Sequence, residues 1–147
     1  MDGLEQQVEG PLAGAELAVP YLLADEAFAD YARRTAAGLT RARVSEPILP
    51  ALAAALWRSR EGTAPRALAV LVSDDDAARS LAESAAAFLP PDTAAFLPSR
   101  GVGWGSGLDP APHLVGERHR GLHTLAQGGL VAVSALVLGL RRMVFES

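Results

Sequence analysis

The sequence predicts an α/β fold in which a parallel sheet of about four strands carries helices on both faces. Short apolar runs alternate along the chain with longer segments whose apolar residues recur at helical spacing. One run, Arg66–Ser73 (RALAVLVS), is apolar almost throughout, as strands buried on both faces of a parallel sheet are. This repeated alternation of strand and helix favours a layered α/β domain.

Composition narrows the class of protein. The chain has 147 residues, of which 50% are hydrophobic and only 5% aromatic, so we expect one domain with closely packed layers. It has no cysteine, which excludes disulfides, thiolate metal sites and cysteine nucleophiles. The longest apolar run, Leu130–Leu140, is too short to cross a bilayer, and no signal peptide is evident. We therefore expect a cytoplasmic protein without a membrane partner.

The N-terminal segment differs from the rest of the chain. Residues 1–18 are acidic and interrupted by glycine and proline, which predicts a flexible arm ahead of a domain over residues 19–147. The domain is expected to open with a helix over Pro20–Ala37, bounded by Pro20 and Gly38.

The next elements follow from local patterns. Arg41–Ser45 (RARVS) is a strand candidate, and Pro47–Arg60 is an amphipathic helix whose Trp57 is expected to pack in the core. After the strand Arg66–Ser73, Ser73 is expected to cap a helix that runs to Leu89. Asp74, Asp75 and Asp76 fall in the first turn of this helix. They suit its dipole there, and a metal site is the alternative interpretation.

The second half of the chain repeats this alternation. Thr93–Leu97 is a strand candidate, and after a glycine-rich loop Asp109 is expected to cap a helix over Pro112–Gln127. Gly128 and Gly129 supply the positive φ of a helix C-cap. A fourth strand is expected at Leu130–Ser134 and a short final helix at Ala135–Met143.

The loop between Leu97 and Arg118 carries a family resemblance. In the UvrB-like N-terminal domain of transcription-repair coupling factors (Mfd), a strand ending in Leu/Phe-Pro leads to a Ser-Pro-x-Pro-x-x-x-Gly-x-Arg helix start. This chain has Leu97-Pro98, then Asp109-Pro110-Ala111-Pro112 and Gly116-Glu117-Arg118 in the same register. It departs from the family at Arg100–Gly105, where the family usually has Trp-Glu-Thr-Leu-Pro-Tyr. The resemblance extends more weakly from Tyr21 to Met143.

The resemblance implies a RecA-like, P-loop-helicase-type domain whose nucleotide site is degenerate. The full-length family protein is similar to an ATP-dependent DNA translocase that displaces stalled RNA polymerase and recruits excision repair through UvrA. Its motor motifs and its usual UvrA-contacting domain would lie beyond Ser147. The implied partners of this domain are the downstream domains, with UvrA and RNA polymerase reached through the whole protein and only weak contact to DNA.

The residues themselves argue against nucleotide chemistry. The turn Ser45–Pro50 precedes the helix where a phosphate loop would lie, yet it has no glycine and no lysine. Two prolines remove backbone donors from this turn, and Glu46 would repel a phosphate. All thirteen basic residues of the chain are arginine. We therefore expect no catalytic residue, no cofactor and no metal.

Three residues are predicted to form an interaction surface. Arg100 and Trp104 lie in the glycine loop and Arg118 follows it, and Trp and Arg are frequent anchors of protein interfaces. A mobile crossover and a nucleic-acid contact are the alternatives for this loop. His119 and His123, four residues apart on one helix face, are expected to be solvated, with a zinc site as the alternative. A different class of function also stays open, that of a stand-alone small α/β enzyme or ligand-binding protein that uses the Gly101–Gly107 loop.

Overall fold

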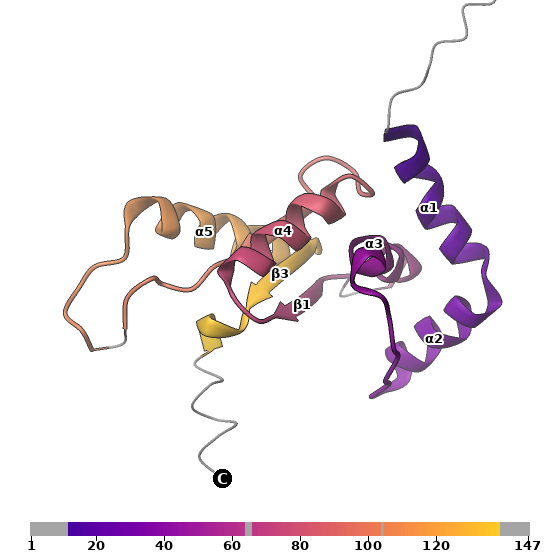
Figure 1. Cartoon of the computed structure of the whole chain (residues 1–147), viewed down its shortest axis with the longest axis horizontal. Coiled ribbons are helices and arrows are strands. Elements are labelled where there is room, and N and C mark those ends of the chain that lie inside the picture. The colour runs from indigo at the N-terminus through magenta and orange to yellow at the C-terminus, as the bar shows by residue number, and fades with distance from the viewer. Residues whose placement is uncertain (1–11, 64–65, 104, 139–147) are drawn as a thin grey trace, which may run out of the picture.

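The computed structural model describes residues 12–63, 66–103 and 105–138 as an α/β arrangement (Figure 1). In chain order the elements are α1 (Leu12–Ala24), α2 (Glu26–Ala37), the 3-10 turn η1 (Glu46–Ile48), α3 (Leu49–Ser59), β1 (Leu68–Val72), α4 (Asp75–Ala86), β2 (Ala94–Leu97), α5 (Pro112–Ala126), β3 (Leu130–Ser134) and the 3-10 turn η2 (Ala135–Leu138). The predicted α/β class with a parallel sheet is therefore confirmed.

The sheet of the described residues has three parallel strands in the order β1-β3-β2. Leu130 of β3 lies opposite Leu68 of β1 on one side and Ala94 of β2 on the other. Because β3 is central, all five of its residues are buried, which its apolar sequence LVAVS permits. The last strand in the sequence thus forms the middle of the sheet.

Helices cover the two faces of the sheet unequally. On one face, Trp57 of α3 and Leu81 of α4 pack in the clusters that contain Leu130 and Ala132 of β3. On the other face, Leu125 of α5 packs against the strands β2 and β3. On this second face Leu71 of β1 is 51% exposed, so α5 leaves the β1 side uncovered.

The expectation that Trp57 packs in the core is confirmed. Its ring is 4% exposed, its Nε1 donates to the Gly128 carbonyl over 2.8 Å, and the Arg66 guanidinium lies 3.6 Å from its ring centroid. The bond to Gly128 joins α3 to the turn that precedes β3, and the Arg66 contact joins α3 to the segment that precedes β1.

The helices α1 and α2 stand beyond α3, away from the sheet (Figure 1). Val19 of α1 and Phe28 of α2 are buried against Ala54 and Ala55 of α3, which attaches this helical pair to the domain. The alanines allow close approach of the helices, as the composition indicates.

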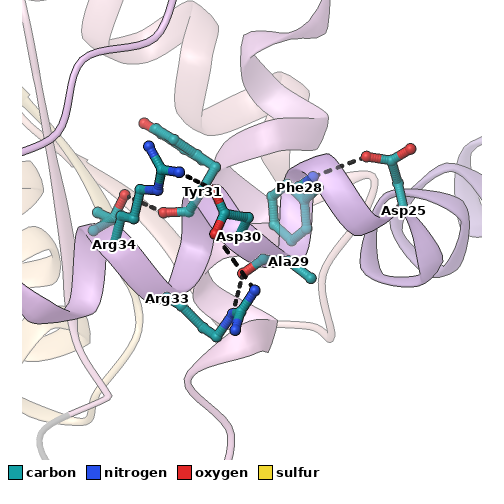
Figure 2. Close-up of polar contacts among 8 residues, drawn as sticks. Asp25, Phe28, Ala29, Asp30, Tyr31, Arg33 and Arg34 are labelled. Atoms are coloured by element: carbon teal, nitrogen blue, oxygen red, sulfur yellow. Dashed lines mark hydrogen bonds and ion pairs between the residues drawn. The ribbon is translucent and has the colours of Figure 1, made fainter.

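A single helix over Pro20–Ala37 is not what forms. Asp25 has extended backbone angles and accepts a hydrogen bond from the Phe28 N–H over 2.8 Å, so it caps α2 and separates it from α1 (Figure 2). Figure 2 also shows Asp30 paired with Arg33 and Arg34 on the exposed side of α2, at 3.4 and 2.8 Å. The helix α1 starts at Leu12, inside the segment expected to be an arm, and residues 1–11 lie outside the described residues.

The strand expected at Arg41–Ser45 is wrong, and the described sheet has three strands where four were expected. The segment has the alternation of a strand, but no described strand lies beside it to accept its hydrogen bonds. Most of its side chains are exposed, including Arg41 and Arg43. Alternation in sequence fixes a strand only where a neighbouring strand is available.

Other predicted boundaries agree more closely. The helix expected over Pro112–Gln127 is α5, and Gly128 has the predicted positive φ of +82° after it. The helix expected to end at Leu89 ends at Ala86. The final element begins at Ala135 as expected but is a 3-10 turn to Leu138, and the rest of the segment to Met143 lies outside the described residues.

Candidate functional site

The carboxyl ends of the three strands meet at one edge of the sheet, and ligands of open parallel sheets usually bind at this edge. The helix α4 begins there with Asp75, directly after the two-residue turn Ser73–Asp74 that leaves β1. Pro98 and Ser99 follow β2, and Ser134 ends β3. We call this set, together with Arg118 of α5, the edge cluster.

Asp75 is the centre of the edge cluster. Its carboxylate accepts hydrogen bonds from the backbone N–H of Ser99 over 2.8 Å and from the Ser99 hydroxyl over 2.7 Å, each to a different oxygen. Ser134 at the end of β3 is fully buried, and its side chain helps to lower the pKa of the same carboxylate. Asp75 therefore joins the start of α4 to the ends of β2 and β3.

These contacts change the acidity of Asp75. Burial raises the pKa of the carboxyl, but the hydrogen bonds from Ser134 and Ser99 and the nearby charge of Arg118 outweigh it. The pKa of Asp75 is therefore below its ordinary value of 3.8, and the group is a carboxylate at neutral pH. A carboxylate that already accepts several hydrogen bonds is a poor general base, since these bonds stabilise its charged form.

Arg118 supplies the positive charge of the edge cluster. Its guanidinium donates to the carbonyl oxygen of Pro98 over 2.6 Å, and the side chain is partly buried. Pro98 itself is fully buried. Arg118 thus anchors the first residue of the loop to α5, which is a positioning role that the sequence alone did not indicate.

Of the three predicted interaction residues, the structure describes Arg100 and Arg118. Arg118 points toward Pro98 and the edge cluster, Arg100 is partly buried beside Ser99, and Trp104 lies outside the described residues. The loop leaves the edge cluster through Gly101, whose N–H donates to the Ser99 hydroxyl oxygen over 3.3 Å. The loop is therefore tied down at its start by Ser99 and Pro98.

The three carboxylates at the start of α4 have separate roles. Asp74, not Ser73, is the N-cap residue, and its side chain accepts from the Ala77 N–H over 2.8 Å. The bond from Ala77, with one from the Ser73 hydroxyl, lowers the pKa of Asp74. Asp75 turns to Ser99, and Asp76 is exposed. The expectation that all three serve only the helix dipole is thus wrong for Asp75.

The cap expected at Asp109 is also wrong. The residue in the N-cap position of α5 is Ala111, and no side chain caps the helix there. Pro112 opens the helix and needs no N–H partner, so α5 can begin without a polar cap.

The turn Ser45–Pro50 does not follow a strand of the described sheet. Its residues form η1 and the first turn of α3, and Ile48 occupies the N-cap position without a side-chain cap. The first described strand, β1, leads instead to the acidic start of α4. A phosphate group at that helix start would meet the charges of Asp74, Asp75 and Asp76.

The histidines of α5 lie on its surface. His113, His119 and His123 are all exposed, and within the described ranges no three His, Cys, Asp or Glu side chains gather as they would around a metal ion.

Sequence reasoning missed Asp75, Ser99 and Ser134 as partners. The available signal was their position, since each polar residue lies at the end of a predicted strand or two residues beyond it, and parallel strands end at one edge. The spacing between them, up to 59 positions in sequence, gives no local pattern to detect.

Comparison of the chain with protein-family models, with curated proteins and with solved structures finds no match to any of them. In the part of the chain that the structure describes, no helix is both long enough and apolar enough to cross a membrane.

Proposed function

We propose that this chain is a non-catalytic scaffold domain, the UvrB-like N-terminal domain of a transcription-repair coupling factor. The observation that carries the scaffold role is the edge cluster. At the edge where a parallel α/β domain usually binds its ligand, Asp75, Ser99, Ser134 and Arg118 hydrogen-bond within the protein. Because the polar groups at this edge are already hydrogen-bonded to one another, the arrangement suits a domain that binds partners through its loop and not one that converts a substrate.

The family assignment rests on the sequence resemblance around Leu97-Pro98 and Gly116-Glu117-Arg118. The fold is compatible with it, because those two motifs fall at the end of β2 and in the first turns of α5. The same family assignment includes a RecA-like fold whose nucleotide site is degenerate. It is supported by the parallel sheet and by the acidic residues at the start of α4.

In this proposal the domain acts in transcription-coupled nucleotide excision repair. It packs against the downstream domains of the same protein, and through the whole protein it serves contact with UvrA and RNA polymerase. Contact with DNA is weak, because the chain has a net charge of −4 and few arginines beyond residue 97. The parent protein would be the ATP-dependent translocase, and this domain would contribute no catalytic residue.

The test measures whether the chain binds partner proteins and whether it binds or hydrolyses ATP. The purified chain is titrated with UvrA and with the remaining domains of a coupling factor, and separately with ATP and Mg²⁺ by calorimetry. We expect saturable binding to one of the two proteins and no nucleotide binding tighter than about 1 mM. Micromolar ATP binding, or measurable hydrolysis, would contradict the scaffold role. Failure to bind either protein would contradict the coupling-factor assignment.

A further inference from the structure

The strand β2 has an open outer edge. It pairs only with β3 among the described residues, and the Leu130 N–H donates to the Thr93 carbonyl oxygen over 2.8 Å. Backbone groups of successive residues in a strand point to opposite edges. The groups of Ala95 and Leu97 therefore face β3, whereas those of Ala94 and Phe96 face outward.

A cavity of about 250 Å³ runs along this outer edge between α4 and α5. Its floor includes Ala94 and Phe96, which carry the outward backbone groups. We call this cavity the edge groove. It lies beside the edge strand, so an extended chain placed in it would be in position to pair with β2.

Four charged side chains line the edge groove. Arg79 and Glu83 come from α4, one turn apart, and Glu117 and Arg120 come from α5. The Arg79 guanidinium lies 4.8 Å from the centroid of the Phe96 ring. Among the described residues Glu83, Glu117 and Arg120 make no ion pair and no side-chain hydrogen bond.

The charges are ordered along the groove. Both helices start at the carboxyl end of the sheet and run back along β2, so Arg79 and Glu117 lie toward Phe96, and Glu83 and Arg120 lie toward Ala94. Each end of the groove thus carries a positive charge on one side and a negative charge on the other. From Phe96 toward Ala94, the charge on α4 changes from positive to negative, and the charge on α5 changes from negative to positive.

The equal number of positive and negative side chains in the edge groove indicates which kind of molecule can bind there. A nucleic acid would meet two carboxylates as well as two arginines, so a polyanion gains little there. A second copy of the chain, paired through the same edge, would instead appear as self-association of the free chain before any peptide is added, and that result would count against a partner segment as the occupant.

We propose that the edge groove binds an extended segment of a partner protein, which adds to β2 as a further strand and carries acidic and basic side chains in a fixed order. Side chains of a strand face alternately toward α4 and α5. The residue beside Arg79 is acidic, and its neighbour beside Glu117 is basic. The next, beside Glu83, is basic, and the fourth, beside Arg120, is acidic. The inference depends on the edge and its charges and stands apart from the coupling-factor assignment.

Charges near an edge strand also serve to block pairing, so the two roles need to be separated. Blocking charges usually lie on the strand itself, but β2 is the uncharged sequence AAFL. Here the charges come from the flanking helices, and β2 itself carries none.

The experiment uses two peptides of identical composition with the full chain. The probe is Thr-Val-Glu-Lys-Lys-Glu-Val-Thr, and the control is Thr-Val-Glu-Lys-Glu-Lys-Val-Thr, which matches only half of the groove charges. Binding is measured by NMR titration, and amide hydrogen exchange is followed at Ala94 and Phe96. We expect the probe to bind with a Kd below about 1 mM, at least fivefold more tightly than the control, and to protect both amides.

The second part of the experiment exchanges two charged residues of the protein. Arg79→Glu combined with Glu83→Arg keeps the net charge but reverses the order on α4, and we expect it to weaken probe binding at least fivefold. The matched control exchanges a pair of the same spacing on α2, Asp30→Arg with Arg34→Asp, and should leave binding unchanged. Equal binding of both peptides, no saturable binding, or unprotected amides would each overturn the proposal. If the exchanged variant fails to fold, the peptide comparison on the unaltered chain still decides.

Discussion

Ser99 and Asp75, 24 residues apart in sequence, are joined by two hydrogen bonds, from the Ser99 N–H at 2.8 Å and from its hydroxyl at 2.7 Å. This pair ties the second residue of the long loop to α4, the helix that follows the first strand. Because the two bonds end on different carboxylate oxygens, an amide in place of the carboxylate cannot accept both.

Replacing this carboxylate should therefore destabilise the fold. We expect Asp75→Asn to lower the free energy of unfolding by about 1–3 kcal/mol, since one donor of Ser99 loses its acceptor. The measurement is urea unfolding followed by circular dichroism. The matched control is Asp76→Asn, one residue later and exposed, which should change stability by less than about 0.5 kcal/mol. Equal effects of the two substitutions would assign the cost to the helix start and not to the Ser99 contact.

The same carboxylate predicts how stability depends on pH. The pKa of Asp75 in the folded protein lies below its ordinary value of 3.8, so the unfolded chain binds this proton more readily. Its contribution to stability is complete above about pH 5 and is lost as the pH falls through the lowered pKa. Unfolding free energies measured from pH 7 to pH 3 should fall less steeply in Asp75→Asn than in the unaltered chain. Parallel curves would show that Asp75 does not titrate differently on folding.

Close contact between α5 and β2 gives a third prediction. A Cβ at Gly121 would be 2.6 Å from the Phe96 carbonyl oxygen, so Gly121→Ala must push the helix away from the strand. We expect a loss of about 1–3 kcal/mol in thermal or urea unfolding. Gly116 lies in the same helix with nothing within 4 Å of its Cβ position. There, Gly116→Ala should be neutral or stabilise by up to about 1 kcal/mol, and a loss at both positions would contradict the packing argument.

The loop supplies a prediction that concerns association. If the loop docks onto another domain, Trp104→Ala should leave the fold stable to within about 1 kcal/mol. It should weaken binding to the downstream domains, or to UvrA, by about 2 kcal/mol or more. A melting curve is paired with a binding titration. Unchanged affinity would reduce the loop to a crossover, and loss of the fold would make Trp104 a core residue.

Elements that depend on their own residues could be predicted from the sequence, whereas elements that depend on a distant segment could not. The strands at Leu68–Val72 and Leu130–Ser134 and the helix α5 were predicted because their apolar patterns and glycine ends are local. The segment Arg41–Ser45 was predicted wrongly because a strand depends on a neighbour that the segment itself does not specify.

The candidate site was the least predictable part. The frequency of arginine at interfaces predicts a surface role for Arg118, whereas no local pattern indicates its hydrogen bond to the Pro98 carbonyl oxygen within the domain. For Asp75, the local sequence indicates only a role at the start of the helix. Its bond to Ser99 cannot be predicted locally, because it depends on how β1 and β2 are placed around β3. Strand order is a property of the whole sheet, and no window of the sequence carries it.

The strand order also bears on how the chain folds during synthesis. The strands β1 and β2 are made first but never touch in the sheet, because β3 lies between them. A nascent chain that ends before Leu130 therefore has no strand pair of the described sheet to form, however much of its helix content is present. The ribosome must deliver β3, the last strand of the described sheet, before the first two strands acquire a common neighbour, so the sheet should form in a single late step.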